Sequence, residues 1–186
     1  MMAETLVQGP PEEQEICVKC GFCCDGTIFG HAHLKPGEKA SIPEKLRINI
    51  YIENGEEYFP QPCPYFEGKC TIYNQCRAEI CGTYRCQLLK DLATGLINNS
   101  EALRIVTGAV EMKNSIINEY KRIDGKGEAI SFRQLLVKLG KLRKASERNG
   151  LVNPDIDLLI ARCNIFEALL IKNFHSADDF EKLVMK

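Results

Sequence analysis

Single polar or aromatic residues separate the apolar residues between positions 46 and 52. These apolar residues are Leu46, Ile48, Ile50 and Ile52. A period of two is typical of a half-buried strand, and the following Asn54-Gly55 predicts the tight turn of a hairpin. We expect the return strand around residues 57–59. Prolines at positions 60, 62 and 64 end it, because proline cannot donate a hydrogen bond to the ladder.

Apolar residues recur every three or four positions after residue 86, and this period predicts amphipathic helices. Ser131 and Gln134 have the spacing of a capping box, in which side chain and backbone satisfy each other at a helix start. Asn153-Pro154 predicts a cap followed by proline at the first helical position. The predicted helices are Gln87–Ile97, one capped by Ser100 and broken at residues 124–127, one from Ser131 to Asn149-Gly150, one from Asn153, and a short one capped by Ser176.

Composition adds little to this picture. The chain has 186 residues, 45% of them hydrophobic and 26% charged, with a formal net charge of −1. These values are typical of globular proteins and favour neither nucleic acid nor a membrane as a partner. No apolar run is long enough to span a membrane. The N-terminus lacks the basic and apolar regions of a signal peptide, so we expect a cytoplasmic protein.

Basic side chains gather on the predicted helix that starts at Ser131. They are Arg133, Lys138, Lys141, Arg143, Lys144 and Arg148. Such a stripe could bind nucleic acid or an acidic protein partner, but it is more often the solvated side of an amphipathic helix. We therefore consider nucleic acid an unlikely partner and leave a protein partner open.

Nine of the ten cysteines lie in the first 100 residues. In a reducing compartment, dense cysteines indicate metal or redox chemistry more often than a disulfide scaffold, which is the alternative. The first group has the pattern Cys17-x2-Cys20-x2-Cys23-Cys24. Bacterial ferredoxins use a similar run of three cysteines to bind a [4Fe–4S] cluster. Gly21 and Gly26 offer the positive φ angles that a tight curl of the backbone needs.

A second group follows at gaps of five to seven residues. Its members are Cys63, Cys70, Cys76, Cys81 and Cys86. Together with the first group, within 70 residues of chain, they predict a metal centre. The fold class that we expect is α+β, mainly α. A disordered tail (1–15) precedes an irregular metal-binding module with a short β-hairpin (16–86), and a helical bundle follows (87–186).

The cysteines and their neighbours resemble a known family. The residues that carry the resemblance are Cys17-x2-Cys20-Gly21-x-Cys23-Cys24, Cys63-Pro64-Tyr65-Phe66, Gly68-x-Cys70-x-Ile72-Tyr73 and Arg77-x3-Cys81. This pattern, over residues 16–86, is similar to that of the CxxCxxCC, or YkgJ-like, cysteine-cluster family, described as a zinc- or iron-chelating domain. The family usually has Arg-Pro after the tyrosine, whereas here Arg77-Ala78 is displaced by one extra residue. The resemblance implies a ligand pool of Cys17, Cys20, Cys23, Cys24, Cys63, Cys70, Cys81 and Cys86.

Several alternatives stay open from the sequence. The ligand gaps favour a [4Fe–4S] cluster, yet all-cysteine sites also suit zinc, and eight thiols exceed the needs of one four-thiolate site. The protein is expected to be a metal-binding protein with a structural or interaction role. The alternative is an iron–sulfur-dependent redox or protein-modifying enzyme, since flagellin lysine methylases carry a similar cysteine pattern. No catalytic residue can be assigned.

A few further side chains near the cysteines could take part in their chemistry. His31 and His33 are possible zinc ligands, and Asp25 and Glu79 could act as a base or accept a hydrogen bond. Cys163, outside both groups, falls on the apolar face of a predicted helix and is expected to be a buried free thiol.

Overall fold

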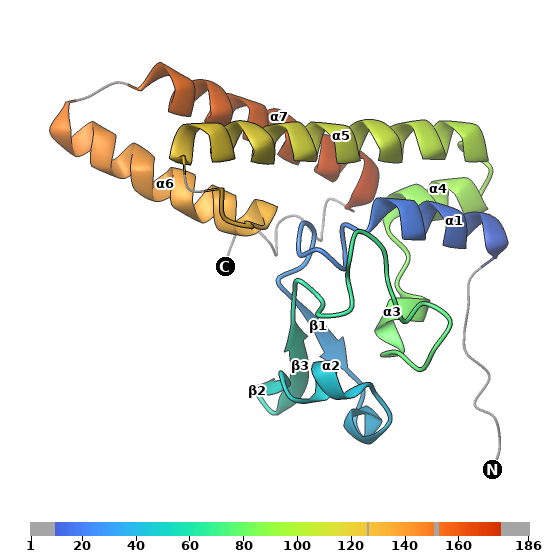
Figure 1. Cartoon of the computed structure of the whole chain (residues 1–186). Helices are drawn as coiled ribbons and strands as arrows, with labels where there is room; N and C mark the ends of the chain where they lie inside the picture. Colours follow the sequence, from blue (N-terminus) through green and yellow to red (C-terminus); the bar gives the residue numbers. More distant parts are fainter. Residues whose placement is uncertain (1–9, 126, 151–152, 176–186) are drawn as a thin grey trace, which may run out of the picture. The chain divides into compact units, whose positions relative to one another are not determined.

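A computed structural model of the chain describes residues 10–125, 127–150 and 153–175 (Figure 1). It is mainly helical with one small antiparallel sheet, which confirms the predicted α+β, mainly α, fold class. Two compact units are present. The first comprises the chain up to Arg85 together with Leu89–Asn99, and the second comprises Cys86–Leu88 together with the chain from Ser100 onward.

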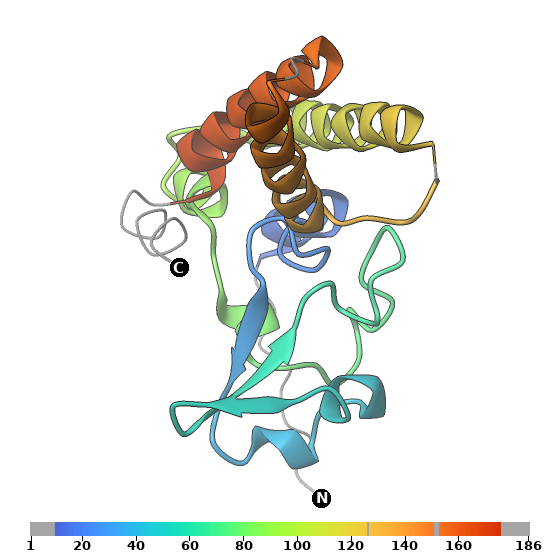
Figure 2. The same ribbon diagram turned by 90° about the vertical axis from the view of Figure 1, so that its left-hand side faces the viewer.

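The first unit is built from short elements. They are α1 (Pro11–Cys20), β1 (His31–Leu34), the 3-10 helix η1 (Glu38–Ala40), α2 (Glu44–Arg47), β2 (Tyr51–Glu53), β3 (Glu56–Pro60) and α3 (Ile80–Thr83). The strands form an antiparallel sheet in the order β1-β3-β2, with β3 in the centre (Figure 2). The predicted hairpin turn is confirmed, because Asn54 and Gly55 both have positive φ angles, of 53° and 83°.

The strand predicted over residues 46–52 is wrong in its first half. Leu46 belongs to α2 and is buried, while Ile48 and Ile52 are exposed. The alternation therefore does not mark one buried face, and only Tyr51–Glu53 pairs with β3. Strand β1 has no alternating pattern of its own and was not predicted. It forms because β3 offers it a partner, with His33 opposite Tyr58.

The disordered tail predicted for residues 1–15 is wrong over residues 11–15, which open α1, whereas residues 1–9 lie outside the described chain. Pro11 is suited to the first helical position. Glu12 and Glu13 lie in the first turn, where a carboxylate favours the helix dipole. Glu13 is buried, and its carboxylate accepts a hydrogen bond of 2.6 Å from Nε of Arg85.

A small apolar core forms around residues of the sheet. Its buried members are Leu34, Ile42, Leu46, Phe59, Ile72 and Ala78. Three cysteines from the second group, Cys63, Cys70 and Cys81, are partly buried and pack against it. The core therefore holds the segments that carry these cysteines.

The second unit contains most of α5 (Asn99–Asp124) together with α6 (Phe132–Asn149) and α7 (Pro154–Phe174), while α4 (Gln87–Ala93) spans the boundary between the units. The capping box of Ser131 and Gln134 is confirmed, as are the Asn153 cap and the end of α6 at Gly150. The rings of Phe132 and Phe166 meet edge to face, with 4.8 Å between their centroids.

An ion pair and a buried thiol add to the contacts within this unit. Arg162 of α7 pairs with Glu119 of α5, and Cys163 is buried as expected. The short helix predicted from Ser176 lies outside the described residues. No helix in the described residues is both long and apolar enough to cross a membrane.

Candidate metal centre

The first cysteine group lies on the last turn of α1 and the tight loop after it. Cys17 and Cys20 belong to α1, and Gly21 ends the helix in the left-handed conformation, with φ of 66°. Backbone N–H groups of Cys24 and Asp25 both donate to the Gly21 carbonyl, at 2.9 Å. A side chain at Gly21 would collide with the Phe66 ring, since a Cβ atom there would lie 2.6 Å from it. The loop can therefore curl this tightly only because position 21 is glycine.

The second group reaches the same place through backbone contacts. The N–H of Cys63 donates to the carbonyl of Cys24 at 2.7 Å, which joins the two groups directly. Residues Phe66 and Cys70 pair across a small loop, and the N–H of Thr71 donates to the Tyr65 carbonyl at 2.9 Å. Cys81 lies in the short helix α3.

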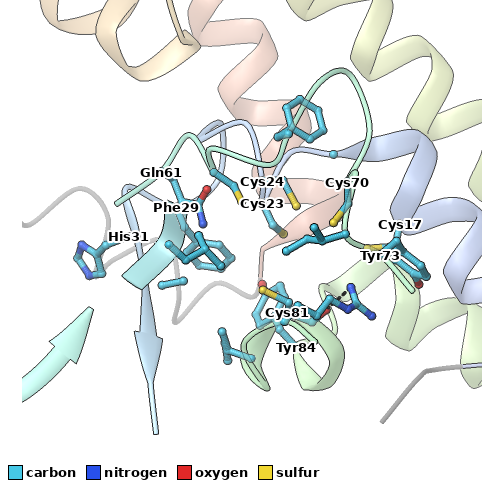
Figure 3. Close-up of a pocket in the computed structure, with 18 of the residues that line it drawn as sticks. Cys17, Cys23, Cys24, Phe29, His31, Gln61, Cys70, Tyr73, Cys81 and Tyr84 are labelled. Atoms are coloured by element: carbon cyan, nitrogen blue, oxygen red, sulfur yellow. Dashed lines mark hydrogen bonds between the residues drawn. The ribbon is translucent and has the colours of Figure 1, made fainter. Parts of the chain in front are cut away.

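These elements enclose a cavity of about 290 Å³ within the first unit. Six of its lining residues are cysteines, namely Cys17, Cys23, Cys24, Cys63, Cys70 and Cys81. Figure 3 shows Cys17 beside Tyr73 at one end, Cys23, Cys24 and Cys70 in the middle, and Phe29 and His31 toward the other end. The remaining lining residues are mostly apolar or aromatic, and none is Asp or Glu.

Burial controls the chemistry of these thiols. It is the main reason why the pKa values of Cys17, Cys24 and Cys63 are raised, and why that of Cys81 is raised to about 12. Repulsion between neighbouring thiolates adds to the effect, and at Cys24 it comes from Cys81, Cys17, Cys70 and Cys63. These five thiols are thus close enough to influence one another. The raised pKa values keep Cys17, Cys24, Cys63 and Cys81 neutral at pH 7 in the absence of a cation, and a bound metal ion would supply the charge that deprotonates them.

Within the described residues, no three His, Cys, Asp or Glu side chains are arranged closely enough to hold one metal ion. A [4Fe–4S] cluster makes a different demand, because each thiolate binds a separate iron and the ligands surround a volume. The six cysteines that line the cavity outnumber the four thiolates that either kind of centre needs. The donors are also of the soft type that iron–sulfur clusters and zinc select.

The two remaining members of the predicted ligand pool, Cys20 and Cys86, are not among the residues that line the cavity. Cys76, which the sequence left out of the pool, is exposed, and its thiol donates to the Ser41 carbonyl at 3.1 Å. All ten cysteines are described, and none forms a disulfide.

The other candidates near the cysteines differ in position. His31 and His33 both line the cavity, and each packs edge to face against Tyr58, with ring centroids 4.9 and 5.3 Å away. Asp25 accepts a hydrogen bond of 2.8 Å from the N–H of Thr27 and so shapes its own loop. Glu79 forms an ion pair with Lys35. Neither carboxylate lines the cavity.

No family model, curated protein or solved structure matches this chain. The resemblance to the CxxCxxCC family therefore stays a prediction from the residues. The displaced arginine of that pattern still lies at the cavity, where the Arg77 guanidinium stacks over the Tyr73 ring, 4.2 Å from its centroid. Arg77 and Tyr73 are therefore in contact despite the extra residue between them in the sequence.

Sequence reasoning missed several residues of the cavity wall. Phe29 and Tyr84 meet edge to face, with 5.0 Å between centroids, and Gln61 has a buried Oε1 atom without a hydrogen-bond partner among the described residues. None of them has a spacing that signals chemistry. Only Tyr84 has a position that could have indicated a place in the cavity wall, because it lies between Cys81 and Cys86 in the sequence.

Proposed function

We propose that this chain is a metal-binding protein whose centre, a [4Fe–4S] cluster or zinc, is held by cysteines of the cavity. The observation that carries the proposal is the convergence of six cysteines, from two groups far apart in sequence, on one cavity without a carboxylate. The gaps of the first cysteine group, which are those of ferredoxin ligands, favour a cluster over a single zinc ion.

The candidate ligands are the six cysteines of the cavity wall, with Cys20 and Cys86 as the further members of the predicted pool. When bound, the metal would link the α1 loop, the Cys63–Cys70 segment and α3. This chain's own residues would position the thiolates and exclude water, since Phe29, Phe66 and Tyr84 cover the cavity wall. A structural role follows, because ligation would contribute folding free energy to a unit with a small core.

A second candidate is a redox or protein-modifying enzyme, to which the similarity with flagellin lysine methylases points. One observation favours it: the cavity continues beyond the cysteines to His31 and Gln61 and so leaves room beside a centre. Reversible bleaching of a visible chromophore by reductant would favour this enzyme. A colourless protein that does not respond to reductant would favour the structural role.

The deciding experiment is iron, zinc and acid-labile sulfide analysis of the full chain purified without oxygen. We expect iron with sulfide in the wild type, loss of both in Cys70→Ser, and retention in Cys76→Ser. Cys76→Ser is the matched control because Cys76 lies in the same segment but is exposed. Stoichiometric zinc without sulfide would identify the centre as a zinc site. A wild type without any metal would contradict the proposal.

A further inference from the structure

Arg77 is the one Lys or Arg among the residues that line the cavity. Its guanidinium stacks over Tyr73, and Nη1 donates to the Cys81 carbonyl at 3.3 Å. In the described part of the chain, no carboxylate lies within ion-pair distance of it. The lining contains no Asp or Glu either, so the anions that the cavity can offer this cation are thiolates.

A charge in an apolar cavity is costly unless an opposite charge accompanies it. Four thiolates around one Zn²⁺ leave two negative charges uncompensated, and thiolates around an iron–sulfur core also carry net negative charge. A permanent cation in the cavity wall offsets part of this charge. Arginine is suited to the position because its guanidinium stays protonated and stacks on an aromatic ring.

We infer that Arg77 is the counter-charge of the metal–thiolate centre and strengthens metal binding without being a ligand. The inference rests on the proposed function. The inference also implies that the cavity prefers an all-thiolate centre to a centre with two thiolates and two imidazoles. The first carries net negative charge, which a cation in the wall stabilises, whereas the second is neutral. Tyr73 then acts as the platform that holds the guanidinium in place.

Two substitutions separate charge from packing. Arg77→Met keeps an apolar stem against Tyr73 and removes the charge, whereas Arg77→Lys keeps the charge and removes the planar stack. Arg104→Met is the matched control, since Arg104 belongs to the other unit and its side chain is 77% exposed. The full-length proteins are prepared metal-free under reductant, and Zn²⁺ affinity is measured by competition with a chromophoric chelator. Far-UV circular dichroism of each variant reports its folding.

We expect Arg77→Met to bind Zn²⁺ about 10- to 100-fold more weakly, the loss typical for residues that support metal ligands. Arg77→Lys should recover most of that loss, and Arg104→Met should match the wild type. Wild-type affinity in Arg77→Met overturns the inference. Equal weakening in Arg77→Lys and Arg77→Met also overturns it, because stacking would then be the cause. A wild type that binds neither zinc nor an iron–sulfur cluster overturns the proposed function itself, which is a different result.

Discussion

Gly21 and Phe66 show how single residues set the geometry of the candidate site. The left-handed conformation of Gly21 turns the chain between Cys20 and Cys23, and the Phe66 ring occupies the space where a side chain would lie. Gly37 has a similar conformation, with φ of 84°, but open space around it. A substitution at Gly37 would therefore introduce backbone strain alone, whereas a substitution at Gly21 would add a collision with Phe66.

We predict that Gly21→Ala costs more stability than Gly37→Ala. Both changes place a side chain in the left-handed region, at about 1–2 kcal/mol, and only the first also displaces Phe66. Urea unfolding of the full-length variants under reductant measures the difference, and metal analysis should show a loss confined to Gly21→Ala. Equal destabilisation would mean that the Phe66 ring moves aside freely.

Cys163 is a buried thiol that does not line the cavity. Burial on α7 raises its pKa to about 12, with a smaller contribution from Glu167. We predict that iodoacetamide at pH 8 modifies the exposed Cys76 but not Cys163 until denaturant is added, which peptide mass spectrometry can follow. Because the unfolded thiol ionises first, this group lowers stability as pH rises from about 9 toward 12. Rapid native labelling of Cys163 would contradict its burial.

Among the elements, α1 depends on tertiary contacts to an unusual degree. No side chain caps its start, and only Glu13 and Ile16 of the helix are buried. The ion pair of Glu13 with Arg85 connects the helix to the segment before α4. Since α1 carries Cys17 and Cys20, this ion pair also positions the first cysteine group.

We predict that Arg85→Ala lowers the free energy of unfolding by about 1–3 kcal/mol, because it leaves the buried Glu13 carboxylate without its charged donor. Lys19→Ala provides the control on the same helix. Its ion pair with Glu15 is exposed, and such pairs contribute less than about 1 kcal/mol. Urea unfolding of both variants makes the comparison. Similar small losses would mean that Glu13 finds water when Arg85 is removed.

At the scale of the whole molecule, the two units differ in how they are stabilised. The first has short elements around a cluster of six buried apolar residues, with further buried residues such as Phe22 and Ile28 outside that cluster. The second has long helices with matched apolar faces, including Phe132 against Phe166. The chain entropy of the first unit is therefore less fully offset by burial, and metal ligation would supply the remainder.

We predict that chelator and reductant together make the first unit sensitive to protease while a helical fragment from about Ser100 onward resists. The reductant excludes disulfides as a substitute for metal. Fragment masses from limited proteolysis, compared with untreated protein and with far-UV circular dichroism, provide the measurement. Resistance along the whole metal-free chain would assign the centre an accessory role and favour the redox enzyme.

The sequence by itself determined the features that depend on neighbouring residues. The capping box of Ser131 and Gln134 joins residues three positions apart, and the Asn54-Gly55 turn needs only two residues that tolerate positive φ. Such features depend mainly on a few adjacent residues, so they could be predicted without knowledge of the fold. The same holds for the fold class, which follows from helical periods after residue 86 and one hairpin before it.

Tertiary structure decided the features that depend on partners distant in sequence. Strand β1 exists because β3 pairs with it, and the ion pair of Glu13 with Arg85 connects α1 to a segment about 70 residues further along the chain. Spacing alone could not tell which cysteines converge, since the contact of Cys63 with Cys24 and the position of Arg77 arise only when the chain folds back. The physical reason is that burial and pairing are properties of the folded arrangement, whereas turns and caps are properties of a few adjacent residues.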